Sequence, residues 1–124
     1  MALLDWSRLG RRANEDGEFR LLARFWNASV RIEAGAEHVR VAMRDGVVAG
    51  IEPWGGRAAS DLTIVAPESA WREMLKPVPR PFYHDLAAAA AHHEFGLYGD
   101  VRHRCAYYPA VRRLVELMRE IHNA

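Results

Sequence analysis

The sequence predicts an α+β fold in which a mostly antiparallel sheet of about five strands is covered on one face by helices. Between residues 29 and 51, apolar residues alternate with polar ones in three successive stretches. This period of two is typical of strands in a sheet that is wetted on one face. Helical spacing of apolar residues precedes and follows the strands, and segregated strands and helices favour α+β over a doubly wound parallel sheet.

The 124 residues have room for a single domain, which we place over residues 1–124 with helices in 1–26 and the main core in 27–124. The formal charge of +1 indicates no partnership with nucleic acid or with an anionic membrane surface. Cys105 is the only cysteine, which excludes an intrachain disulfide and fits a cytoplasmic location. The longest apolar run, residues 86–91, is too short to cross a bilayer.

Two helices are expected to open the chain. Apolar positions recur weakly over residues 2–13, and residues 14–17 (Asn-Glu-Asp-Gly) then supply a break with capping residues. Asp16 is a suitable N-cap for the second helix. One face of that helix carries Phe19, Leu22, Ala23 and Trp26.

The strand pattern predicts a three-stranded meander. Its first two apolar sets are Val30, Ile32, Ala34 and then Val39, Val41, Met43. Asp45-Gly46 is the sequence of a type I′ hairpin turn and leads into a third strand over residues 47–51. Residues 53–57, which include a Gly-Gly pair, end that strand, and residues 62–65 form a fourth.

The second half predicts three helices and a strand. Pro67 opens a helix in which Trp71, Met74 and Leu75 share a face, and three prolines between residues 77 and 81 end it. A helix over residues 82–92 comes next, with an apolar face made of Phe82, Leu86, Ala89 and Ala90. Residues 95–99 form the last strand, Asp100 is a suitable cap after it, and residues 110–122 form an amphipathic closing helix.

No pattern of residues indicates catalysis, a cofactor or a metal. His92-His93-Glu94 lacks the i, i+4 histidine spacing that lets two imidazoles share an ion, so a polar helix end is the better interpretation. Cys105 with His103 is a weak nucleophile pair, because a lone apolar cysteine is usually buried and inert. Turn or capping roles explain Asp45, Asp61 and Asp100, and no glycine-rich loop has nucleotide-binding spacing.

The second half combines large apolar side chains with five consecutive alanines, residues 87–91. Small side chains that face bulky ones either permit tight packing or leave a pocket, and methionine adapts to ligands of irregular shape. A plain core is the commoner outcome of such a stripe. If the space is a pocket, the expected ligand-binding residues are Trp54, Trp71, Met74, Leu75, Phe82, Leu86, Leu97, Leu114 and Met118.

Three stretches together resemble the sterol carrier protein type two family. They are the strand, Asp-Gly turn and strand of residues 39–48, the Ala-Ser-Asp-Leu-Thr-Ile strand of 59–64 with the helix of 68–75, and the Phe-Gly-Leu-Tyr-Gly-Asp segment of 95–100 with the closing helix. The likeness covers residues 27–124. It implies an apolar tunnel between sheet and helices and transfers no catalytic residue.

We therefore expect non-catalytic binding of a hydrophobic small molecule, such as an acyl chain, a sterol or an isoprenoid. An alternative is an interaction module with a filled cavity that pairs with itself or with an enzyme subunit through exposed Trp and Tyr. A small enzyme of the ketosteroid isomerase type is disfavoured, because such folds return strands at the end, whereas a helix closes this chain.

Overall fold

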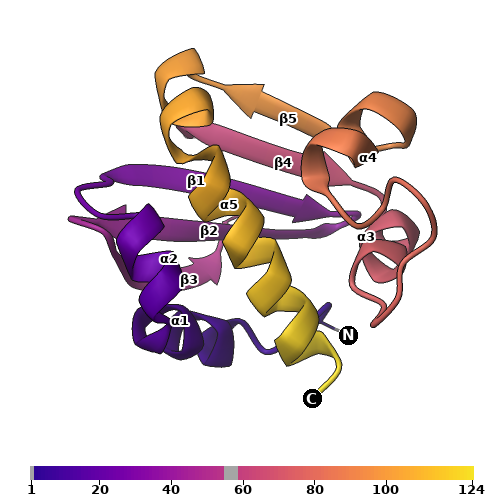
Figure 1. Cartoon of the computed structure of the whole chain (residues 1–124), viewed down its shortest axis with the longest axis horizontal. Coiled ribbons are helices and arrows are strands. Elements are labelled where there is room, and N and C mark those ends of the chain that lie inside the picture. Colours follow the sequence, from indigo (N-terminus) through magenta and orange to yellow (C-terminus); the bar gives the residue numbers. More distant parts are fainter. Residues whose placement is uncertain (1, 55–58) are drawn as a thin grey trace.

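The computed structural model describes residues 2–54 and 59–124, and one sheet with helices along one side organises them (Figure 1). The elements in chain order are α1 (Trp6–Glu15), α2 (Gly17–Leu22), β1 (Ala28–Ala34), β2 (Glu37–Arg44), β3 (Val47–Pro53), β4 (Leu62–Ala66), α3 (Glu68–Met74), α4 (Leu86–His92), β5 (Gly96–Gly99) and α5 (Val101–His122).

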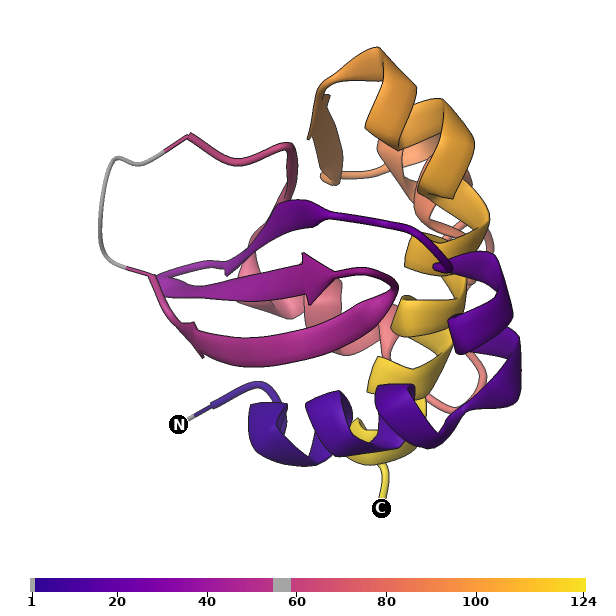
Figure 2. The ribbon, with the colours of Figure 1, turned by 90° about the vertical axis from the view of Figure 1, so that its left-hand side faces the viewer.

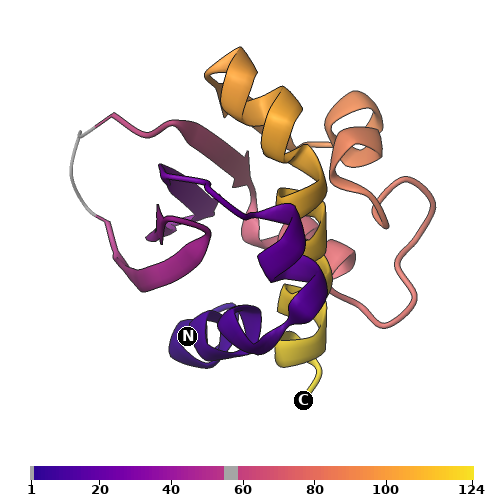
Figure 3. The same ribbon diagram turned by 60° about the vertical axis from the view of Figure 1, so that its left-hand side comes forward.

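The five strands lie in the order β3-β2-β1-β4-β5, and every neighbouring pair is antiparallel except β1 with β4. This confirms the predicted α+β class and the meander. Alternate residues of β1, β2 and β4 are buried, so one face of the sheet packs on the core. Figure 2 shows α5 beyond that face, and Figure 3 shows α1 and α2 beside α5.

The turn between β2 and β3 confirms the predicted type I′ hairpin. Asp45 and Gly46 both have positive φ, at 49° and 79°. The Gly46 N–H donates to the Trp26 carbonyl at 3.0 Å, and a Cβ on Gly46 would lie 2.9 Å from the Ala23 carbonyl oxygen. Glycine is therefore needed here for its backbone angle and because other backbone passes close by.

Aspartate side chains start four of the helices. Asp5, Asp16, Asp85 and Asp100 each accept a hydrogen bond from a backbone N–H in the first turn of α1, α2, α4 and α5. The predicted caps at Asp16 and Asp100 are confirmed. The first helix, expected over residues 2–13, begins only after the Asp5 cap.

Two predicted helix boundaries are wrong next to aromatic residues with positive φ. The second helix ends at Leu22 instead of reaching Trp26, because Phe25 takes a φ of 67° in the turn that leads to β1. The helix predicted from residue 82 begins at Leu86, because Phe82 has a φ of 69° and Asp85 is an extended N-cap. Ala90, expected on its buried face with Phe82, is exposed.

The closing helix is longer than the predicted residues 110–122, since α5 begins at Val101 and contains Pro109. Its first half lacks an apolar stripe and is held by other contacts. Tyr107 stacks on Trp26 with ring centroids 4.7 Å apart, and the Trp26 indole N–H donates to His103 Nδ1 at 3.0 Å. Tertiary contacts of this kind offset the hydrogen bond that a proline removes from a helix interior.

Candidate ligand site

Six of the nine predicted ligand-binding residues are fully buried and belong to one apolar cluster between the sheet and the helices. They come from α3 and its C-cap, from α4 and from α5, and they are Trp71, Met74, Leu75, Leu86, Leu114 and Met118. The structure thus brings together side chains from distant parts of the sequence.

The other three predicted residues lie at the edge of this cluster or away from it. Leu97 on β5 is half-buried and packs against the cluster. Phe82 is 45% exposed and stacks on His92, with ring centroids 4.0 Å apart. The Trp54 ring lies 5.1 and 5.5 Å from the guanidinium carbons of Arg31 and Arg40, on the sheet face that the helices leave uncovered. Ligand contact by any of the nine stays a prediction.

Hydrogen bonds brace α3 on both sides. The Trp71 indole N–H donates to the Glu33 carbonyl of β1 at 2.9 Å. At the other end of α3, the Arg119 guanidinium donates to the Met74 carbonyl at 3.1 and 2.8 Å, and the Asn123 amide donates to the Leu75 carbonyl at 2.6 Å. Burial lowers the pKa of Arg119. These bonds connect α3 to the sheet and to α5, so they fix the position of this helix beside the apolar cluster.

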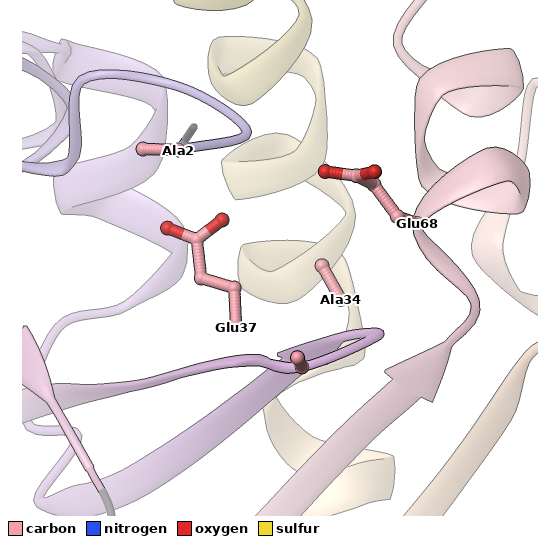
Figure 4. Close-up of a pocket in the computed structure, with 5 residues that line it drawn as sticks. Ala2, Ala34, Glu37 and Glu68 are labelled. Carbon is pink, nitrogen blue, oxygen red and sulfur yellow. The ribbon is translucent and has the colours of Figure 1, made fainter.

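A pocket of about 470 Å³ opens at the end of the sandwich where β1 turns into β2 (Figure 4). Its volume is within the usual range for small-molecule sites. The residues that line it are Ala2, Ala34, Ala36, Glu37 and Glu68.

The pocket adjoins the buried cluster. Ala34 lines it and is itself a core residue. Glu68 lies one helical turn before Trp71, whose indole is bonded to the residue that precedes Ala34. In Figure 4 the Glu37 and Glu68 carboxylates stand on opposite sides of the pocket. The lining of the pocket therefore reaches the core through Ala34.

The N-terminal segment lies along one side of the pocket, a feature that the sequence analysis missed. The Leu3 N–H donates to Glu37 Oε1 at 2.8 Å, and the Leu3 carbonyl accepts from His122 Nδ1 at 2.7 Å. Glu37 Oε2 accepts from the Trp6 indole N–H at 2.7 Å. The adjacent Leu3 and Leu4 were a visible apolar signal, but no local pattern identifies Glu37 or His122 as their neighbours.

The histidine pair packs against aromatic side chains, whereas the cysteine lies on the surface. His93 stacks on Tyr83 with centroids 3.8 Å apart, and its Nε2 lies 3.0 Å from the Pro81 carbonyl. The expectation that Cys105 is buried is wrong, because this residue is exposed on α5. Within residues 2–54 and 59–124, no three His, Cys, Asp or Glu side chains are grouped to hold a metal ion. No helix of this part of the chain is both long and apolar enough to span a membrane.

The fold is shared with solved structures. A crystal structure of sterol carrier protein 2 superposes with a TM-score of 0.73 and 22% identity over 95% of this chain and 96% of that one. The chain has the sterol carrier protein 2 fold. A conserved hypothetical protein from Thermus thermophilus, suggested to be a sterol carrier protein, matches the sterol carrier protein 2 fold of this chain with a TM-score of 0.69 and 22% identity, over 91% of this chain and 82% of that one.

A third solved structure with this fold is UbiJ-SCP2, a ubiquinone synthesis protein, with a TM-score of 0.57 and 14% identity over 91% of this chain and 90% of that one. No family model matches the sequence, and a search of curated proteins finds no match. The backbone arrangement therefore confirms the resemblance to the sterol carrier protein 2 fold that three sequence stretches predicted.

Proposed function

We propose that the protein binds a hydrophobic small molecule, such as an acyl chain, a sterol or an isoprenoid, without catalysing a reaction. The observation that carries the proposal is a pocket that adjoins an apolar cluster in a sheet-and-helix sandwich of the sterol carrier protein 2 type. A cytoplasmic location stays a prediction.

The proposed wall consists of the six buried residues named above together with Leu97. Met74 and Met118 contribute unbranched, polarisable side chains that can repack around an irregular ligand. Ala89 of α4 and Ala110 of α5 are buried in the same cluster, and their small side chains take up little of its space. Trp54 and Phe82 are left out of the wall, because their side chains lie outside the cluster.

Transfer of apolar surface from water supplies the driving force. A ligand that buries about 300 Å² of apolar surface gains roughly 7 kcal/mol at about 25 cal/mol per Å². Part of that gain is spent on separating side chains that now touch, because the wall residues are buried against one another. Binding therefore requires the pocket end of the cluster to widen.

The alternative function is an interaction module that pairs with a second copy or with an enzyme subunit. The uncovered sheet face favours it, because Tyr98 is 61% exposed there and Trp54 lies on the same face. Sedimentation of the purified protein tests this alternative. A stable complex in a protein that binds no lipid would support the interaction module over ligand binding.

Methionine methyl NMR tests the proposed site without altering the wall. The sequence has four methionines, at positions 1, 43, 74 and 118. Titration with a pyrene-labelled fatty acid should shift the methyl signals of Met74 and Met118. Met43, at the end of β2 away from Glu37, should shift least. Native mass spectrometry of freshly purified protein reports any ligand already bound.

Two outcomes would contradict the proposal. One is the absence of any bound lipid together with unchanged methyl signals at saturating probe. The other is binding that shifts neither Met74 nor Met118, which would place the probe elsewhere on the surface.

A further inference from the structure

We propose that residues 2–4 form a displaceable gate at the pocket end of the ligand site. This inference rests on the proposed function, because a gate needs a ligand to admit. In the free protein the gate closes the end of the apolar cluster, and it moves aside when a hydrophobic ligand enters.

The backbone of Leu3 connects the sheet with α5. Its N–H is bonded to Glu37 at the start of β2, and its carbonyl is bonded to His122 in the last turn of α5. Ala2 next to it lines the pocket, opposite Glu68 of α3 (Figure 4). The segment therefore lies across the end of the sandwich, between the sheet and the helices.

The side chains of the gate occupy apolar space. Leu3 is 2% exposed and Leu4 is 7% exposed, and both belong to the same cluster as the proposed wall. An apolar ligand chain can take over this role, since burial of one hydrocarbon surface replaces burial of another.

The other elements around the pocket are held more firmly than the gate. The Trp71, Arg119 and Asn123 side chains brace α3. α1 is fixed to β3 by Asn14, which donates to the Val48 carbonyl at 2.9 Å and accepts from its N–H at 2.8 Å. Residues 2–4 belong to no helix or strand. Two side-chain bonds and two leucines hold them, so the segment can part from the cluster while α1 stays in place.

When the gate moves aside, no buried charge is left without a hydrogen-bond partner. Glu37 is only partly buried and keeps its bond to the Trp6 indole, because Trp6 belongs to α1. The carboxylate oxygen that Leu3 leaves faces the pocket and water. Release of the segment thus breaks two hydrogen bonds, the charge-assisted one to Glu37 and the one from His122, and water replaces most of both.

Stopped-flow fluorescence with the pyrene-labelled fatty acid tests the gate. Glu37→Gln leaves a single, uncharged acceptor oxygen for the Leu3 N–H and the Trp6 indole N–H, so the gate is held less firmly. The association rate should rise by about tenfold, the factor that corresponds to loss of one such bond. Glu68→Gln is the matched control: it lines the same pocket, removes the same charge and does not touch the segment, so its rate should stay within about twofold of wild type.

Hydrogen exchange gives the second measurement. Saturating probe should speed exchange at the amides of Leu3 and Leu4, while the amides of α3 keep their protection. Equal acceleration by Glu37→Gln and Glu68→Gln would assign the effect to pocket charge and overturn the gate. So would tight probe binding with Leu3 and Leu4 still protected, although the proposed function would stand. Absence of probe binding in wild type and both variants would overturn the gate and the proposed function together.

Discussion

Replacement of Asp16 by asparagine should destabilise the protein strongly, because this carboxylate connects three helices. It accepts from the Phe19 N–H of α2 at 2.8 Å, from the Arg113 guanidinium of α5 at 3.0 and 2.9 Å, and from Arg12 of α1 at 3.2 Å. The Asp16 side chain is only 7% exposed. Asparagine can still cap α2, but it leaves Arg113 without its buried partner.

The expected loss is about 3 kcal/mol of unfolding free energy at pH 7, at the lower end for a broken buried pair because the Arg113 side chain is 25% exposed. The melting temperature should fall by roughly 10 °C. Glu18→Gln is the control, since Glu18 lies 2.8 Å from Arg113 but is 59% exposed, and its loss should cost less than about 1 kcal/mol.

The effect of Asp16→Asn should depend on pH in a defined direction. The Arg113 hydrogen bonds hold the pKa of Asp16 well below its usual value in the folded protein. The stabilisation is therefore complete above the unfolded pKa of about 4 and is lost as the pH falls towards the folded pKa. Urea titrations should show the gap between wild type and variant shrink between about pH 4 and pH 2. A loss at pH 7 no larger than that of Glu18→Gln would refute the reasoning.

Three further predictions concern the turn, the core and a tyrosine. Gly46→Ala should lower the free energy of unfolding in urea by about 1–3 kcal/mol, because alanine must take a positive φ and its Cβ would lie 2.9 Å from the Ala23 oxygen. Gly50→Ala is the control and should cost under about 1 kcal/mol, because the space around its Cβ is open. Met118→Ala should lower the free energy of unfolding by about 2–5 kcal/mol, because it leaves a cavity in the core. If the ligand binds there, probe at a hundredfold excess over its Kd should restore about 2.7 kcal/mol, and an unchanged melting temperature on probe addition would contradict that site. Burial and then the Asp85 bond raise the pKa of Tyr108 to about 12, so ultraviolet titration should show one late-ionising phenol that Tyr108→Phe removes.

Much of the sheet could be predicted, because its information is local. Alternation in β1 and β2 assigns each side chain to one face, and Asp45-Gly46 sets the turn between β2 and β3. The early start of α5, which the sequence did not predict, depends on contacts far along the chain. Stacking of Tyr107 on Trp26 holds the part of α5 that has no apolar stripe, and periodicity cannot report such a contact.

Part of the candidate site could likewise be predicted from local pattern, and part could not. Helical spacing in α3 and α5 indicated Met74 and Met118 as inward residues, and both are buried. The pocket itself was missed, because it forms where the chain start, the turn after β1 and the start of α3 meet. Glu37 and Glu68 gave no signal in the sequence, since isolated glutamates are ordinary surface residues.

The sequence by itself determined which strand residues face inward and where the chain turns between β2 and β3, because periodicity and the backbone preferences of Asp and Gly act within a few positions. Only the tertiary structure decided that Leu3 lies between Glu37 and His122, and that a pocket opens beside it. Contacts between residues far apart in the chain depend on how all the layers pack at once, and no local pattern encodes them.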